Sequence, residues 1–140
     1  MTTQPIVFLD FDGVLHRGTS GTFRKAPLVD DIVRRVPRLG IVLSTNWRHN
    51  NSLETLREYF VHESTVEAII DALPILPFTS RGHRQREIEH WLARQPQVRR
   101  YVALDDSPEL FDTGWAGLHL VDPREGLTPL DVERIVARLA

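Results

Sequence analysis

The segment IVFLDFDGVL, residues 6–15, decides the fold of this chain. Its four consecutive apolar residues, 6–9, predict a short strand that is buried on both faces, as strands of parallel sheets are. Asp10 follows the strand directly, and Asp12 lies two residues further on, so both side chains can project to the same side of an extended chain end. Gly13 permits a sharp exit from this turn. The segment therefore predicts a buried parallel strand with a pair of carboxylates at its carboxyl end.

The rest of the chain alternates between apolar runs and segments with helical spacing. Further strands are predicted at 41–43, 101–104 and 118–121. Helices are predicted from Pro27 to Val36, after Asn51 or Ser52, from Arg84 to Arg94, and from Thr128 through Leu139. Residues 61–78 fit either a helix or a short strand. Strands that alternate with helices predict an α/β fold with three layers around a central parallel sheet.

The composition predicts a single domain that spans residues 1–140, with 41% hydrophobic residues and 17 basic against 19 acidic ones. No apolar stretch is long enough to cross a membrane, and residues 1–5 lack the features of a secretory signal, so we expect a cytoplasmic protein. The absence of cysteine excludes disulfides and thiolate-bound zinc. A net charge of −2 argues against a surface that binds nucleic acid all over, but leaves room for a local basic patch.

Polar residues follow three of the predicted strands at the point where each strand ends. They are Asp10 and Asp12 after the first strand, Ser44-Thr45-Asn46 after the second, and Asp105-Asp106 after the third. Because ligands of open parallel sheets bind beyond the carboxyl ends of the strands, these groups are expected to meet in one site. Four carboxylates in one place repel one another unless a cation lies between them. Hard oxygen ligands without cysteine favour Mg²⁺.

The same residues predict the hydrolysis of a phosphomonoester. Asp10, at the tip of the strand, would attack a phosphorus atom and form an aspartyl-phosphate. Asp12 would protonate the leaving oxygen and later activate the water that hydrolyses the intermediate. A hydroxyl such as that of Thr45 can donate a hydrogen bond to a phosphoryl oxygen, and a fixed cation can neutralise the charge that develops on it.

Three motifs resemble those of the haloacid dehalogenase-like (HAD) superfamily of phosphatases and phosphotransferases. Residues 10–15, DFDGVL, are similar to its first motif, residues 43–46, LSTN, to its second, and residues 104–107, LDDS, to its acidic fourth motif. The three occur in the right order, and the resemblance covers essentially the whole chain. The run Thr45–Arg48 and the predicted helix around Trp91 also resemble the HAD domain found in RNA-repair proteins.

The resemblance implies a Rossmann-like core without a cap domain, because the two places where HAD proteins carry caps are too short here for one. It implies that Asp10 is the nucleophile and Asp12 the general acid and base. Since Asp12 is present, it implies a phosphatase rather than a dehalogenase. An open, capless site suits a phosphate at the end of a polymer or on a protein, and a nucleotide or a nucleic-acid end is the leading substrate class.

The resemblance also implies ligands for the metal and for the phosphate. Mg²⁺ would be bound by Asp10, by the backbone carbonyl of Asp12 and by the Asp106 carboxylate. Asp105 would either bind the ion directly or orient one of its ligands. The hydroxyl of Thr45 would bind phosphate. Ser44 is the alternative to Thr45, and Asn46 lies beside them.

The third motif of the family, a lysine at the start of a helix, is not matched. The only lysine, Lys25, lies far too early in the chain. Arg84 is the best substitute, with Arg81 and Arg86 as alternatives, although a planar guanidinium is not equivalent to a compact ammonium. The structural interpretation of Arg84 is a solvated charge at a helix start. This departure keeps a second hypothesis open, a catalytically weak module that binds phosphate or a partner.

Other side chains near these motifs have both a structural and a functional interpretation. Trp47 could stack on a base, but a buried aromatic residue is the more frequent case. Arg48 could touch phosphate or pair with a carboxylate of a loop. His16, in the loop after Asp12, could contact substrate, but a surface position is expected. The arginines between residues 81 and 100 predict a solvated face rather than a nucleic-acid track.

Overall fold

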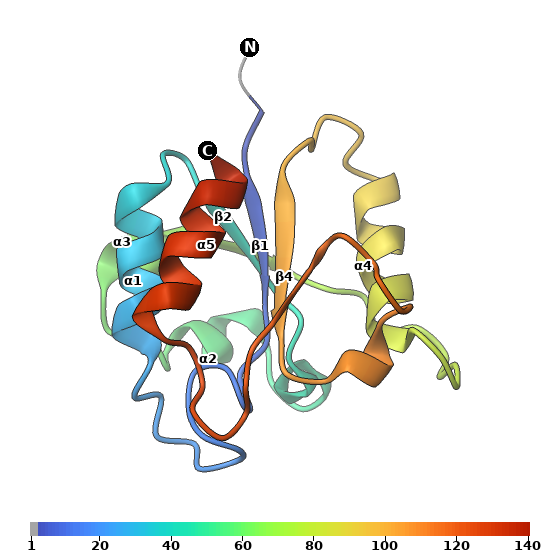
Figure 1. Ribbon diagram of the computed structural model, residues 1–140, viewed down its shortest axis with the longest axis horizontal. Coiled ribbons are helices and arrows are strands. Elements are labelled where there is room, and N and C mark those ends of the chain that lie inside the picture. Colours follow the sequence, from blue (N-terminus) through green and yellow to red (C-terminus); the bar gives the residue numbers. More distant parts are fainter. Residues whose placement is uncertain (1–2) are drawn as a thin grey trace.

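The structure, a computed structural model, describes residues 3–140 and contains a five-stranded sheet (Figure 1). The strands lie in the order β3-β2-β1-β4-β5, and every neighbouring pair is parallel. Their bounds are β1 Ile6–Leu9, β2 Gly40–Leu43, β3 Ile69–Ala72, β4 Tyr101–Asp105 and β5 Leu118–Leu120. The predicted parallel sheet is confirmed.

Helices cover both faces of the sheet, which gives the three layers of the predicted α/β fold (Figure 1). Helices α1 (Ala26–Arg35), α3 (Glu63–Ala68) and α5 (Pro129–Leu139) lie on one face, and α4 (His83–Ala93) lies on the other. The short helix α2 (Leu53–Arg57) and two 3₁₀ turns, η1 (Asn46–His49) and η2 (Pro108–Leu110), lie in connections. None of the helices within residues 3–140 has the length and apolar character that a membrane span requires.

Strand β1 shows why both faces of the sheet need cover. Val7 and Leu9 pack into the core beneath α1 and α5, whereas Ile6 and Phe8 pack into a second core with Trp91 of α4. All four strand side chains are at most 2% exposed. Because successive side chains of a strand point to opposite faces, a continuous apolar run suits a strand buried on both sides.

Residues 61–78 contain both of the elements between which the sequence pattern left the choice open. Helix α3 ends at Ala68, and β3 begins at the next residue, Ile69. Strand β3 lies at the edge of the sheet, where Ile70 is 42% exposed, and its pairing with β2 shifts register between Ile41 and Val42.

The strand register brings the predicted site residues together at the lower end of the sheet in Figure 1. Leu9 at the end of β1 is paired with Leu43 of β2 on one side and with Leu104 of β4 on the other. The residues that come next on these strands are Asp10, Ser44 and Asp105. Their side chains therefore start from neighbouring positions at one edge of the sheet.

Two connections at this edge, residues 10–25 after β1 and 73–82 after β3, contain no helix and no named strand. Neither connection forms a folded cap, in agreement with the capless expectation.

Candidate active site

Three carboxylates meet at the carboxyl end of the sheet. Asp10 follows β1, Asp105 ends β4, and Asp106 comes directly after it. A carboxylate oxygen from each of the three lies within 4.8 Å of the other two. This spacing allows the three oxygens to bind one cation, and carboxylate oxygens are ligands that Mg²⁺ prefers.

The electrostatics of Asp10 and Asp105 favour a cation at this place. Loss of solvation raises the pKa of Asp10 well above its usual range, and the charge of Asp105 raises it further. Burial raises the pKa of Asp105 to about 7, although the backbone N–H of Ser107 donates a hydrogen bond to its Oδ1 at 3.0 Å. The charge of Arg84 offsets these pKa shifts only in part. A divalent cation would stabilise the ionised carboxylates, so the donor set fits Mg²⁺.

Gly13 leaves the room that Asp106 occupies. Its φ of +78° lies in the left-handed region, and a Cβ atom here would lie 2.2 Å from Oδ2 of Asp106. The N–H of Gly13 donates a hydrogen bond to the carbonyl of Gly18 at 2.8 Å, which closes the loop after the first motif. Glycine is therefore required both by the backbone conformation and by the neighbouring carboxylate.

Asp12 lies outside this three-carboxylate cluster, and its side chain is held separately. Its Oδ1 is 2.7 Å from Nε2 of His16, and its Oδ2 accepts a hydrogen bond from the indole N–H of Trp47 at 3.1 Å. The Asp12 side chain is 38% exposed, so it is accessible to a substrate. The expectation of a surface position for His16 is wrong, because this side chain is fully buried against Phe23 and Trp47.

The residues that follow β2 lie at the same edge. Ser44 and Thr45 are each 1% exposed, and Oγ1 of Thr45 caps η1 by accepting a hydrogen bond from the N–H of Trp47 at 3.2 Å. The hydroxyl hydrogen of Thr45 can still be donated to a ligand. Asn46 is the first residue of η1, and its Oδ1 accepts a hydrogen bond from Arg84 at 2.7 Å.

Arg84 belongs to a buried ion network on α4, so its interpretation as a solvated charge is wrong. The fully buried carboxylate of Glu87 lies 2.5 Å from Nη1 of Arg84 and 2.7 Å from Nη2 of Arg48. Arg48 also donates hydrogen bonds to backbone carbonyls just after β2 and β3. The carboxylate partner of Arg48 thus comes from a helix and not from a loop. Nε of Arg84 is buried and has no hydrogen-bond partner among residues 3–140.

A family model describes most of this chain. The model of the HAD domain in Swiss Army Knife RNA repair proteins matches residues 6–132. The chain belongs to this family. The matched range begins with β1 and ends within α5, so it includes all five strands and the site. No curated protein and no solved structure matched the chain.

Of the three arginines considered for the third motif of the HAD domain, Arg84 is the one whose charge lowers the pKa of two carboxylates in the acidic cluster, those of Asp10 and Asp105. Arg86 instead forms ion pairs with two carboxylates that are each about half exposed, and Arg81 is exposed. These contacts place neither Arg81 nor Arg86 beside the cluster of Asp10, Asp105 and Asp106.

His16 and Glu87 contact the candidate site residues Asp12 and Arg84, but neither is among the site residues that the sequence predicts. Glu87 lies three residues after Arg84, a spacing that places two side chains on the same face of a helix. That spacing is the feature of the sequence that indicates an ion pair between Glu87 and Arg84. His16 lies four residues after Asp12, but in a loop, where spacing alone does not predict a contact.

Proposed function

We propose that this HAD domain is a Mg²⁺-dependent phosphatase that hydrolyses a phosphomonoester through an aspartyl-phosphate on Asp10, with a nucleotide or a nucleic-acid end as substrate. The observation that carries the proposal is the division of the acidic residues into two groups. Asp10 lies in the three-carboxylate cluster, whereas Asp12 is oriented separately by His16 and Trp47. A nucleophile and a general acid need different surroundings in this way.

In the first half-reaction, a carboxylate oxygen of Asp10 attacks the phosphorus atom, and the bond from phosphorus to the leaving oxygen breaks. Oδ1 of Asp10 accepts a hydrogen bond from the backbone N–H of Phe11 at 2.9 Å, which leaves Oδ2 for the attack. Asp12, in its protonated form, gives its proton to the leaving oxygen. The products are the aspartyl-phosphate and a free alcohol.

In the second half-reaction, the Asp12 carboxylate takes a proton from a water molecule that attacks the phosphorus of the aspartyl-phosphate. The bond from phosphorus to Asp10 breaks, phosphate leaves, and both side chains return to their starting states. His16 and Trp47 keep Asp12 in one orientation through both halves.

Mg²⁺ would be held by the carboxylates of Asp10, Asp105 and Asp106, which otherwise repel one another, and by the backbone carbonyl of Asp12. When bound, the ion neutralises charge on the carboxylates and on the transferring phosphoryl group.

The remaining phosphoryl oxygens would be bound by the Thr45 or Ser44 hydroxyl, the Asn46 amide and Arg84. Asn46 can donate from its amide nitrogen because its Oδ1 is already engaged by Arg84.

A phosphate-binding or partner-binding module with weak turnover is the second candidate. It is favoured by the state of Arg84, whose two terminal nitrogens are already bonded to Glu87 and Asn46. A cation that shares its charge with a buried carboxylate has less of it to offer a phosphoryl group.

The experiment is the measurement of phosphate release in Mg²⁺ by the wild type, Asp10→Asn and Asp12→Asn. The substrates are an aryl phosphate, nucleotides, and oligonucleotides that carry phosphate at either end. Asp31→Asn, on α1, is the matched control. Turnover that is lost in both site variants but kept in the control supports the phosphatase. Magnesium-dependent binding of these compounds without turnover by the wild type would favour the second candidate.

A further inference from the structure

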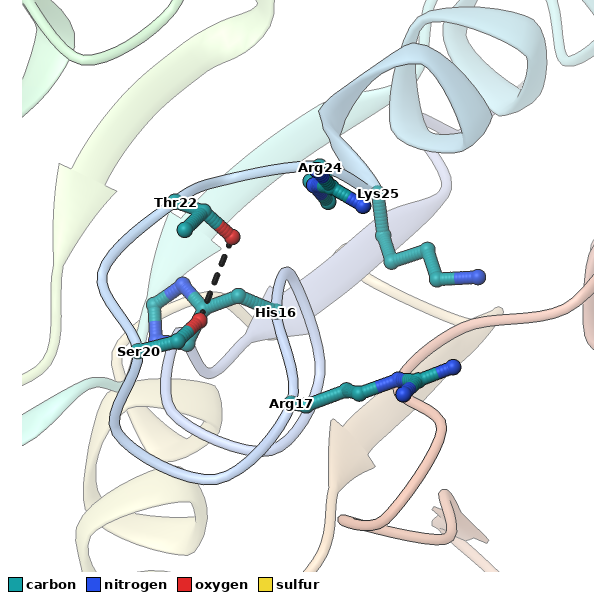
Figure 2. Close-up of a pocket in the computed structure, with 6 residues that line it drawn as sticks. All are labelled: His16, Arg17, Ser20, Thr22, Arg24 and Lys25. Atoms are coloured by element: carbon teal, nitrogen blue, oxygen red, sulfur yellow. Dashed lines mark hydrogen bonds between the residues drawn. The ribbon is translucent and has the colours of Figure 1, made fainter.

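A pocket of about 530 Å³ lies in the loop that follows the first motif. It is lined by His16, Arg17, Ser20, Thr22, Arg24 and Lys25 (Figure 2). Three of these six residues are cationic, and in Figure 2 the side chains of Arg17 and Lys25 extend to the same side of the loop. The volume is typical of sites for small ligands or for parts of larger ones.

Within residues 3–140, no carboxylate neutralises the three cations of this pocket. Across residues 3–140, the side chains of Arg17, Arg24 and Lys25 form none of the hydrogen bonds or ion pairs that the structure records. Some exposed arginines do pair with a carboxylate, as Arg34 does with Asp31, but here three unpaired cations gather in one pocket. In a chain with a net charge of −2, such a group of unpaired cations creates a local positive potential that attracts an anion.

The loop is held in shape by Phe23, so the pocket exists before a ligand arrives. Phe23 has a φ of 53°, which is unusual for a residue with a side chain. Its ring stacks on Tyr59 at 5.1 Å between centroids and meets Phe11 edge-on at 5.1 Å. The N–H of Lys25 donates a hydrogen bond to the carbonyl of Leu15 at 2.8 Å. These contacts stabilise the strained residue and fix the positions of its charged neighbours.

The pocket adjoins the general acid through one shared side chain. His16 lines the pocket, and its Nε2 is 2.7 Å from Oδ1 of Asp12. In the proposed reaction, Asp12 protonates the oxygen that leaves the phosphorus. The part of the substrate beyond that oxygen must therefore lie on the Asp12 side of the site, next to His16 and the pocket that it lines.

We propose that this pocket binds the phosphodiester next to the terminal phosphate that is removed, so that the substrate is a nucleic-acid strand rather than a free mononucleotide. Arg17, Arg24 and Lys25 would contact the non-bridging oxygens of this phosphodiester, as cations of nucleic-acid-binding proteins do. The inference rests on the proposed function, because the role of Asp12 as the acid fixes the direction in which the nucleic acid leaves the site. The pocket then supplies the binding site for the phosphodiester next to the terminal phosphate.

The test compares the wild type with a pocket variant that carries Arg17→Gln, Arg24→Gln and Lys25→Gln. The substrates are a single-stranded oligonucleotide with a terminal phosphate, a nucleoside monophosphate and an aryl phosphate. The wild type should prefer the oligonucleotide. In the pocket variant, kcat/KM for the oligonucleotide should fall by about tenfold or more, whereas kcat/KM for the aryl phosphate stays within about twofold of the wild type.

The matched control removes the same number of charges elsewhere, with Arg94→Gln, Arg99→Gln and Arg134→Gln. These three arginines are exposed and form none of the ion pairs found across residues 3–140. The control should keep the oligonucleotide kcat/KM within about twofold of the wild type. Equal losses in the pocket variant and the control would overturn the inference, because they would reflect net charge alone.

A binding measurement separates this inference from the proposed function. Fluorescence anisotropy in the Asp10→Asn background, with a labelled oligonucleotide that carries a terminal phosphate, reports Kd without turnover. The three pocket substitutions should weaken binding by about tenfold and make log Kd less steep against log salt, by about 0.7 for each phosphate that the protein no longer neutralises. An unchanged Kd and slope would overturn the pocket, whatever the activity. Pocket-dependent binding by a wild type that hydrolyses none of the phosphates would overturn the proposed function alone.

Discussion

The indole of Trp47 and the carboxylate of Asp12 are joined by a hydrogen bond, with Nε1 3.1 Å from Oδ2. Trp47 lies in η1 after β2, and Asp12 lies in the loop after β1, so the bond ties two motifs of the HAD site together. His16 takes the other oxygen of the carboxylate. The proposed general acid therefore has both oxygens engaged by groups that fix its direction while its side chain stays accessible.

Removal of the indole N–H should lower kcat while leaving most of the free energy of unfolding intact. Trp47→Phe keeps an aromatic ring against Phe11 and Phe23 but deletes the donor to Asp12. Hydrogen bonds to charged groups contribute about 1.5–3 kcal/mol, so we expect kcat for an aryl phosphate to fall by about tenfold or more. Steady-state kinetics measures this, and Trp115→Phe, which packs against Phe111, is the control. An unchanged kcat would show that Asp12 does not depend on this bond.

Gly13→Ala should lower the free energy of unfolding by more than left-handed backbone strain alone explains. Gly13 and Gly114 have nearly the same φ, +78° and +77°, but a Cβ at Gly114 would meet no atom within 4 Å. A Cβ at Gly13 would meet the carboxylate of Asp106. We expect Gly114→Ala to lower the free energy of unfolding by about 1 kcal/mol, from left-handed strain alone. Gly13→Ala should lower it further and weaken Mg²⁺ binding, as measured by urea denaturation and calorimetry. Equal effects of the two substitutions would mean that Asp106 moves aside freely.

Much of the fold could be predicted because its signals are local. The apolar run 6–9 is continuous, and the strands predicted at 41–43 and 101–104 are likewise short apolar segments, whereas the strand predicted at 118–121 is interrupted by His119. The exception is the segment around Ile69 and Ile70, where the apolar spacing fits a helix and a strand equally. The switch from α3 to β3 there is decided by pairing with β2, which is a contact between distant parts of the chain.

The acidic part of the site could also be predicted, because strand ends of a parallel sheet meet at one edge. The burial of His16 could not be predicted, because it depends on Phe23 and Trp47, which come from other segments. The same holds for Arg84, whose solvated or buried state depends on contacts with Asn46, 38 residues away. Side-chain partners across elements are set by packing, which a single sequence does not display.

Glu87 should be among the most costly polar residues to replace. Its carboxylate is fully buried and neutralises both Arg48 and Arg84, and its Oε2 accepts a hydrogen bond from the backbone N–H of Leu76 at 3.1 Å. Glu87→Gln leaves two buried guanidinium groups without a counter-charge, so we expect a loss of about 3–5 kcal/mol in the free energy of unfolding. Glu89→Gln, on the surface of the same helix, should cost less than about 0.5 kcal/mol.

Urea denaturation of both glutamate variants measures this difference. A Glu87→Gln variant as stable as the control would mean that the two arginines find solvent or other acceptors. Loss of phosphatase activity in a Glu87→Gln protein that remains folded would further indicate that Glu87 positions Arg84 for the phosphate.

The metal-free protein should become less stable as the pH rises from about 4 to about 7. Burial raises the pKa of Asp105 to about 7 in the folded chain, whereas an unfolded aspartate has a pKa of about 3.9. Between these values the folded state keeps a proton that the unfolded state has released, so the free energy of unfolding falls with rising pH. Below this window both states are protonated, and above it the destabilisation is complete. The raised pKa of Asp10 acts in the same direction.

Chemical denaturation in a chelating buffer between about pH 4.5 and pH 8 measures this dependence. Asp105→Asn should flatten the decline, because the amide does not titrate, whereas Asp31→Asn on α1 should leave it unchanged. Added Mg²⁺ should stabilise the wild type more at about pH 8 than at about pH 5, since the ion binds the ionised carboxylates. A decline of the same steepness in Asp105→Asn would locate the titrating group elsewhere. Stabilisation by Mg²⁺ that is equal at both pH values would argue that the ion does not bind through this cluster.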